Sequence, residues 1–350
     1  MATRHSRHSL QDNHVLLPLT VLGVLAGIDA TFPPTTLVSS SYGVAALVAC
    51  AIATVRTTAV FAVAGSALAA LSGIWNDNFA TLGWWIHVVM TIGLGALAVI
   101  LAHLRIFREQ ALRHMTTIAE AAQRAVLRAI PSSLGSLRFA TRYVSATREA
   151  LVGGDLYEVV PNPDGVRVIV GDVRGKGLAA VQMAATVLAA FRRAAVLEPS
   201  LTGIVAELDK VVTAVAGDED FVTAVLAEFR DDNTVTLVNC GHHPPLLLTN
   251  GDTGSLMDTG DPQPPLGLGP TPEPVTRHLP ECARMLFYTD GLVEARNRQG
   301  AFFPLTERAT TLVGGSLDEA LDGLLGELVR HAADEMDDDM ALLLAERQPA

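Results

Sequence analysis

Four long apolar stretches fill the first third of the chain. Between Val15 and Leu104 the only charged residues are Asp29, Arg56 and Asp77. Each stretch approaches the roughly 20 residues that cross the hydrocarbon core of a bilayer. Helices of a soluble bundle carry a charged face, and these stretches lack one. The sequence therefore predicts four membrane spans: Val15–Phe32, Leu37–Val55, Thr58–Trp75 and Leu82–Leu104.

The charges that flank these stretches predict their orientation. Arg4 and Arg7 precede the first stretch, Arg56 separates the second from the third, and Arg105 and Arg108 follow the fourth. Basic residues collect on the cytoplasmic side of membrane proteins, so both termini are expected in the cytoplasm. The sequence thus predicts a multi-pass protein of the cell (cytoplasmic) membrane, with everything after the fourth span in the cytoplasm.

A charged helix is predicted over residues 105–130, with apolar residues at nearly heptad spacing. Such a helix can pair with a copy of itself and form a homodimer. It can equally lie as an amphipathic helix on the domain that follows. Pro131 ends it, which divides the chain into a membrane domain (1–104), a connecting signalling helix (105–130) and a cytoplasmic domain (131–350).

The cytoplasmic domain is acidic. Residues 131–350 carry 17 basic and 32 acidic side chains, a net charge of −15. A nucleic-acid-binding surface needs the opposite sign, so nucleic acid is not expected as a partner. Most predicted elements are strands, with two adjacent helices in the middle, which indicates a layered α+β fold with antiparallel pairs. The strands are predicted at 138–145, 166–170, 223–229, 235–239, 246–248, 285–288 and 340–345, and the helices at 178–196, 201–215 and 317–333.

Aspartates stand at the ends of several apolar runs. They occur in four signatures: Gly153-Gly154-Asp155, Gly171-Asp172-Val173, Thr289-Asp290-Gly291 and Asp337-Asp338-Asp339. The first three are expected where a strand stops and the last where one starts, so that they converge from neighbouring strands of one sheet. Clustered carboxylates repel each other unless a cation lies among them, and hard oxygen ligands suit Mg²⁺ or Mn²⁺. Two such ions a few ångströms apart form a hydrolytic centre for phosphate esters.

The glycine-rich loop at residues 171–177, Gly-Asp-Val-Arg-Gly-Lys-Gly, joins a strand to a helix. Its glycines let the backbone approach a ligand, and Lys176 at the helix start can meet a phosphate. A P-loop needs a Gly-Lys-Ser/Thr ending, and here Gly177 and Leu178 follow the lysine. A nucleotide cyclase needs Glu-Phe after Gly-Gly-Asp, and here Leu156 and Tyr157 follow. Both nucleotide-binding interpretations are therefore disfavoured.

Two adjacent histidines, His242 and His243, follow another predicted strand. Adjacent histidines can bind zinc, but neighbours in an extended chain point to opposite sides. The three cysteines are isolated and offer no paired ligand spacing, which also indicates reduced thiols. A structural loop is the favoured interpretation.

An ordered set of motifs runs through the second half of the chain. After the signatures at Asp155 and Asp172 come Phe-Val-Thr-Ala (221–224), Gly-His-His-Pro-Pro (241–245), Pro-Leu-Gly (265–267), Tyr-Thr-Asp-Gly-Leu-Val-Glu-Ala (288–295) and Asp-Asp-Met (338–340). This set resembles the PPM-type (PP2C-like) serine/threonine phosphatases of the SpoIIE/RsbU branch, in its membrane-attached actinobacterial form. The resemblance covers about residues 120–347. It implies an α-β-β-α sandwich with two Mn²⁺ or Mg²⁺ ions at one end.

The resemblance also implies roles for individual residues. Asp172 would bridge both ions, and a water activated between them would attack the phosphorus. The run of three aspartates leaves the register of the last ligand open by one, so the resemblance implies Asp338 with Asp339 beside it. The implied metal ligands are Asp155, Asp172, Val173 through its carbonyl, Asp290, Asp338 and Asp339.

The group that protonates the leaving alkoxide stays open at this point. The eukaryotic branch has a histidine two residues after the bridging aspartate, whereas this chain has Arg174, a poor acid. Either Lys176 or a metal-bound water supplies the proton, or Arg174 orients the phosphate. The resemblance implies a membrane-tethered protein phosphatase acting on a phosphorylated anti-anti-sigma (STAS) protein. The alternative is a phosphatase fold used as an inactive binding module, and retention of the acidic positions counts against it.

Overall fold

The structure is a computed structural model that describes residues 6–31, 39–145, 153–217, 219–249, 254–332 and 338–349. By internal contacts the chain divides into two compact units, Met1–His114 and Met115–Ala350. The helix α4 (Leu82–Val126) contains the division point. Each unit is considered by itself.

The first unit is a helical bundle whose helices meet through small residues. It contains α1 (Ser6–Thr31), η1 (Ser39–Tyr42), α2 (Gly43–Ile52), α3 (Val55–Trp75) and the first part of α4. Ala45, Ala46 and Ala49 of α2 are fully buried, whereas Val60 and Val63 of α3 are 65% and 70% exposed. Close packing through small residues, with large apolar side chains such as these exposed, is common among helices that pack in lipid, although Tyr42 and Phe61 are also buried in this core.

The prediction of four spans is only partly supported. Length and hydropathy qualify α3 and residues Leu82–Gln123 of α4 as candidate spans. The apolar parts of α1 and α2, Val15–Thr31 and Gly43–Ile52, are shorter. A third helix qualifies by composition, Leu178–Leu197, but half of it is buried in the second unit. Four spans are therefore not confirmed.

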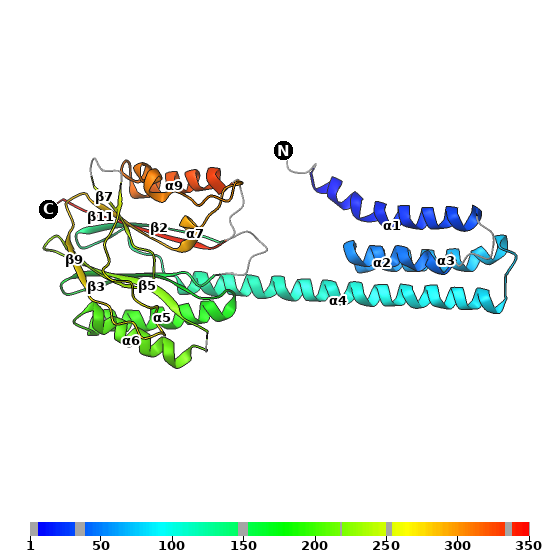
Figure 1. Cartoon of the computed structure of the whole chain (residues 1–350), viewed down its shortest axis with the longest axis horizontal. Coiled ribbons are helices and arrows are strands. Elements are labelled where there is room, and N and C mark those ends of the chain that lie inside the picture. The colour runs from blue at the N-terminus through cyan, green and yellow to red at the C-terminus, as the bar shows by residue number, and fades with distance from the viewer. Residues whose placement is uncertain are drawn as a thin grey trace. The chain divides into compact units, whose positions relative to one another are not determined.

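The second unit is an α-β-β-α sandwich, as the resemblance implied (Figure 1). One sheet has the order β1-β2-β11-β10-β7-β8 and the other the order β3-β4-β5-β6-β9, and all named pairs are antiparallel. The six-stranded sheet consists of β1 (Ser133–Leu134), β2 (Leu137–Val144), β11 (Met340–Arg347), β10 (Arg284–Tyr288), β7 (Leu246–Leu248) and β8 (Ser255–Leu256). The five-stranded sheet consists of β3 (Leu156–Asn162), β4 (Gly165–Val173), β5 (Val222–Arg230), β6 (Thr234–Cys240) and β9 (Val275–His278).

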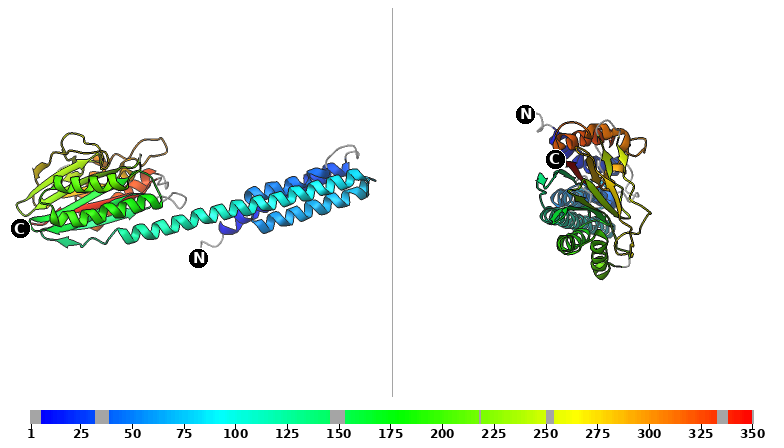
Figure 2. Two further views of the ribbon diagram at one scale, coloured as in Figure 1. Left: turned by 90° about the horizontal axis from the view of Figure 1, so that it is seen from below. Right: turned by 90° about the vertical axis from the view of Figure 1, so that its left-hand side faces the viewer.

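Helices cover the outer face of each sheet. The antiparallel pair α5 (Leu178–Leu197) and α6 (Leu201–Val215) lies on the five-stranded sheet, side by side in both figures (Figures 1 and 2). On the six-stranded sheet lie α7 (Asp290–Val293), α8 (Leu305–Arg308), η2 (Ala309–Leu312) and α9 (Leu317–Ala332). Because both faces of the central strands are covered, β4 is apolar along most of its length. Its Val166, Val168 and Val170 pack between the sheets, while Ile169 packs against the helices.

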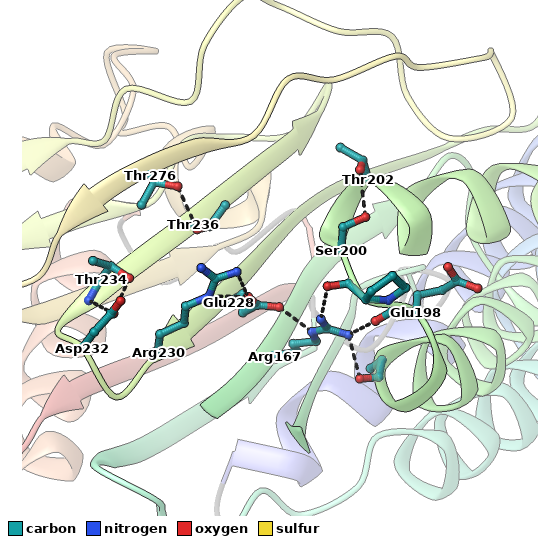
Figure 3. A network of polar contacts seen from close by, with 12 residues as sticks. Arg167, Glu198, Ser200, Thr202, Glu228, Arg230, Asp232, Thr234, Thr236 and Thr276 are labelled. Carbon is teal, nitrogen blue, oxygen red and sulfur yellow. Dashed lines mark hydrogen bonds and ion pairs between the residues drawn. The ribbon is translucent and has the colours of Figure 1, made fainter. Parts of the chain in front are cut away.

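Polar contacts fix the turn that joins α5 to α6. Ser200 caps α6 by accepting a hydrogen bond from the Gly203 amide at 3.2 Å. The turn between α5 and α6 is held by Arg167 of β4 (Figure 3). Its guanidinium pairs with Glu228 at 2.7 Å and donates to the carbonyls of Ala195, Glu198 and Pro199. The far end of the helix pair is thus tied to the sheet.

The last turns of α4 belong to the second unit and lie on α5. Ala119 of α4 is buried against Val181 of α5, and Arg192 of α5 donates to the Val126 carbonyl at 3.1 Å. Farther toward the N-terminus the same helix exposes apolar side chains, with Phe107 and Met115 each 64% exposed. The amphipathic interpretation of residues 105–130 therefore holds for the end of the helix. Its earlier turns leave an apolar side without a covering element among the described residues.

Candidate metal centre

The acidic signatures converge at one end of the sandwich, around a cavity of about 340 Å³. Their carboxylates come from both sheets, and the expectation of neighbouring strands in one sheet is wrong. Asp155 and Asp172 belong to the five-stranded sheet, whereas Asp290 and Asp338 adjoin strands of the six-stranded sheet. Asp155 also precedes β3 instead of ending a strand. Stacking of the two sheets, rather than strand pairing, brings the four residues together.

Three of the carboxylates form a compact group. Asp155, Asp172 and Asp290 each offer an oxygen, and these atoms all lie within 4.8 Å of one another. The carboxylate of Asp155 accepts a hydrogen bond of 2.8 Å from the hydroxyl of Thr289. That hydroxyl in turn accepts from the Ala341 amide of β11 at 2.9 Å. Asp155 is therefore oriented by the opposite sheet.

Burial and mutual repulsion raise the pKa of all three carboxyls. Burial is the largest cause for Asp155, followed by the charge of Asp172. Burial together with the charges of Asp290 and Asp338 raises the pKa of Asp172 to about 7. Burial and the Asp338 charge raise the pKa of Asp290. Three converging oxygens that repel one another fit a hard divalent cation, so this donor set suits Mn²⁺ or Mg²⁺.

The remaining aspartates have other partners, and Asp337 lies outside the described residues. The Oδ1 atom of Asp338 lies 2.8 Å from Nζ of Lys176. Asp339 is 3% exposed, and its carboxylate accepts a hydrogen bond from the Gly153 amide. A Cβ on Gly153 would lie 2.7 Å from that carboxylate, so the approach requires glycine. Both aspartates line the cavity, but neither belongs to the group of three.

The loop after Asp172 is shaped by close backbone contacts. The Val173 amide donates to the Gly154 carbonyl at 3.3 Å, and a Cβ on Gly154 would lie 2.6 Å from the Val173 oxygen. The side chain of Arg174 donates to Glu219 and lies over the Phe221 ring, 5.5 Å from its centroid. Arg174 and Lys176 both line the cavity. The sequence-predicted side chains thus surround one cavity, whereas Val173 is not among the residues that line it.

Three supporting residues were not predicted: Thr289, Thr223 and His242. His242 is 8% exposed, and its ring lies between Thr223 and the carbonyl of Tyr288. Burial, followed by the neighbouring His243, lowers the pKa of His242 to about 3. His243 lines the cavity and stacks on Tyr288. Thr223 and His242 lie within noted motifs, but only the three-dimensional contacts show what they hold.

Solved structures with the same fold include three bacterial proteins. The SiaA-PP2C domain of Pseudomonas aeruginosa has a TM-score of 0.58 and 18% identity, covering 71% of this chain and 99% of that one. The RsbU and RsbW domains of Rv1364c from Mycobacterium tuberculosis have a TM-score of 0.53 and 24% identity, covering 61% of this chain and 60% of that one. A third structure is the PP2C phosphatase domain of SpoIIE from Bacillus subtilis with a fragment of its regulatory domain. It has a TM-score of 0.50 and 17% identity, covering 62% of this chain and 65% of that one. This chain therefore spans less than two thirds of the last two.

A comparison with protein families matches residues 162–348, more than half of the chain, to the family described as Stage II sporulation protein E (SpoIIE). The matched range includes Asp172, Asp290 and Asp338, and it leaves Asp155 just outside. The resemblance to PPM phosphatases of the SpoIIE/RsbU type is confirmed by this match and by the shared fold. The chain belongs to the SpoIIE family.

Proposed function

We propose that this protein is a membrane-tethered, metal-dependent protein serine/threonine phosphatase. The observation that carries the proposal is the group of three carboxylates, Asp155, Asp172 and Asp290, gathered from two sheets beside a cavity that also presents Arg174 and Lys176. The carboxylates can bind metal cations, and the two basic side chains beside them can bind a phosphate. Membership of the SpoIIE family supports the same activity.

The acidic residues hold two ions in this proposal. Asp172 would be shared between them, and the other residues that would hold them are Asp155, Asp290, Asp338, Val173 through its carbonyl, and Asp339. Bound there, two Mn²⁺ or Mg²⁺ ions supply Lewis-acid activation of water and neutralise phosphate charge. Repulsion among the buried carboxylates is relieved when the ions bind, which favours their uptake.

Arg174 and Lys176 act on the substrate phosphate. The guanidinium of Arg174 is held by Glu219 and the Phe221 ring, so it is preorganised to orient phosphate oxygens. The Lys176 ammonium is paired with the Asp338 carboxylate in the structure. A metal ion held by Asp338 would compete with this pair, and the Lys176 ammonium would then serve the leaving alkoxide in the cavity that both residues line. No side-chain nucleophile is required.

The membrane and regulatory parts follow the domain division. Residues 1–104 anchor the protein in the cell membrane, and residues 131–350 form the catalytic domain in the cytoplasm. Residues 105–130 form the signalling helix that connects the two. The exposed apolar side chains of α4, among them Phe107 and Met115, support a homodimer through the connecting helix. The end of α4 reaches the centre through Gln123, which donates to the Tyr143 hydroxyl at 2.6 Å and the Gly153 carbonyl at 3.2 Å.

The substrate in this proposal is a phosphoserine or phosphothreonine of an anti-anti-sigma (STAS) protein, supported by the shared fold with the RsbU domain. The test mixes the full chain in detergent and Mn²⁺ with a serine-phosphorylated STAS domain and follows its phosphate by intact mass. Loss of the phosphate, blocked by EDTA, is expected. A STAS domain that binds but keeps its phosphate would favour an inactive binding module.

A further inference from the structure

One buried side chain contacts a strand of each sheet, at the end of the sandwich where the proposed metal-binding aspartates lie. His242 follows β6, and its Nδ1 lies 2.9 Å from Oγ1 of Thr223 on β5. On the other side of the ring, Nε2 lies 3.1 Å from the carbonyl oxygen of Tyr288 on β10. The ring therefore spans from the five-stranded to the six-stranded sheet at the metal end of the sandwich.

The two contacts fix the proton positions on the ring. A carbonyl oxygen only accepts hydrogen bonds, so Nε2 carries the proton that is donated to Tyr288. In the neutral ring Nδ1 has no proton and accepts from the Thr223 hydroxyl. The low pKa of the buried ring favours this neutral form. His242 is thus held in one tautomer and one orientation.

Both partners of the ring stand next to proposed metal ligands. Thr223 is the register partner of Asp172 in the β4–β5 ladder, and its hydroxyl lies 3.4 Å from the Asp172 carbonyl. Tyr288 ends β10, two residues before Asp290. A shift of the ring would therefore move one ligand relative to the other.

The loop that carries His242 is itself rigidly held. The His242 amide donates to Oδ1 of Asn239 at 2.8 Å, and the Asn239 amide group donates back to the His242 carbonyl at 2.8 Å. Gly241 has φ +69°, and a Cβ there would meet Pro265 at 3.0 Å. The ring is therefore placed by its own loop as well as by the two strands.

From this arrangement we propose that His242 is a positioning residue of the metal centre, which sets the spacing between the Asp172 and Asp290 carboxylates by bridging the two sheets. The inference rests on the proposed function, because it concerns the same centre. Groups that orient metal ligands from behind commonly change metal affinity by about 10–100-fold when removed. A residue that only fills the core changes stability and leaves metal affinity alone.

The test measures Mn²⁺ binding by calorimetry on the full chain in detergent, together with the thermal midpoint in EDTA. His242→Phe keeps the ring volume and removes both hydrogen bonds. His242→Gln retains an amide donor for the Tyr288 carbonyl. The matched control is Thr236→Val, which removes the 2.9 Å hydrogen bond between Thr236 and Thr276 in the same sheet, away from the cavity (Figure 3).

The expected result is a weakening of Mn²⁺ binding by about tenfold or more in His242→Phe, with partial recovery in His242→Gln. Thr236→Val should lower the thermal midpoint without changing Mn²⁺ affinity. If His242→Phe does not fold, Thr223→Val removes the opposite partner of the ring and should weaken Mn²⁺ binding in its place. Wild-type affinity in these variants, or an equal loss in the control, would overturn the inference. A wild-type chain that binds no Mn²⁺ would overturn the proposed function itself.

Discussion

The ammonium nitrogen of Lys176 lies 2.8 Å from Oδ1 of Asp338. The positively charged Lys176 side chain is therefore paired with Asp338, one of the carboxylates that the proposed metal centre needs. Both side chains are about 40% exposed (39% and 42%), and an exposed pair of this kind is worth at most about 1 kcal/mol. The pair can thus be displaced by a divalent ion at modest cost.

This competition predicts an effect of Lys176→Gln on metal binding. Removing the ammonium frees Asp338, so Mn²⁺ should bind more tightly, by up to about fivefold. The rate of ester hydrolysis should fall, because the same ammonium serves the leaving group. Calorimetry and steady-state kinetics separate the two effects. Lys210→Gln, which breaks an equally short exposed pair with Glu207, is the control, and weaker Mn²⁺ binding in Lys176→Gln would contradict the prediction.

A second prediction concerns pH and the metal-free protein. The folded-state pKa of Asp172 is raised to about 7 from its ordinary 3.8, so the folded state binds more protons than the unfolded state between these values. Stability in EDTA is therefore greatest at low pH and falls, by on the order of a few kcal/mol, as pH rises through about 7. Thermal midpoints between pH 5 and pH 8 measure this slope.

Two arms check the origin of that slope. Saturating Mn²⁺ should flatten it at the alkaline end, because the ions offset the repulsion between carboxylates. Asp172→Asn in EDTA should flatten it as well, since the titrating group is gone. Stability that rises with pH in EDTA would show that these carboxyls are not repelling one another.

A third prediction concerns Gly154. A Cβ at this position would lie 2.5 Å from the Cβ and 2.6 Å from the oxygen of Val173, so Gly154→Ala must push the Asp172–Val173 segment away. The expected loss of stability is about 1–3 kcal/mol, with weaker Mn²⁺ binding. Gly323→Ala is the matched control, because that exposed position of α9 has open space, and the change should stabilise the helix by about 1 kcal/mol. Denaturant unfolding distinguishes them.

A fourth prediction concerns the end of α4. Gln123→Leu removes the donor to the Tyr143 hydroxyl and to the buried Gly153 carbonyl, and a buried carbonyl left without a donor costs about 1–3 kcal/mol. Because Gly153 contacts Asp339, Mn²⁺-dependent hydrolysis should fall. Gln182→Leu, at an exposed position of α5, should leave the rate unchanged. Equal hydrolysis rates for the two variants would contradict an effect of the α4 end on the metal centre.

Local signals account for the elements that the sequence predicted well. The helix Leu201–Val215 was predicted with the observed bounds, because its amphipathic pattern starts directly after Ser200. The strand β3 was missed. Its Glu158 is buried against Arg192 of α5, and Pro161 lies near its end, so its pattern does not read as a strand. The short edge strands β8 and β9 are largely exposed and give no apolar alternation.

Long-range packing explains what the sequence could not predict at the site. The residue types of the centre were visible, but the stacking of two sheets that joins Asp172 with Asp290 was not. Adjacent histidines were expected to point to opposite sides. Only the fold shows that His242 joins the sheets and that His243 lines the cavity. Composition also qualifies α5 as a candidate membrane span, although its apolar residues pack inside the sandwich.

Hydrolysis of p-nitrophenyl phosphate by the full chain in detergent decides whether the protein is a metal-dependent phosphatase. The arms are Mn²⁺, EDTA, Asp172→Asn, and Asp258→Asn as an exposed aspartate outside the cavity. We expect turnover that requires Mn²⁺ and returns when the ion is restored after EDTA. Turnover should fall at least about a hundredfold in Asp172→Asn and persist in Asp258→Asn. Wild-type turnover in Asp172→Asn, or turnover untouched by EDTA, would contradict a two-metal phosphatase.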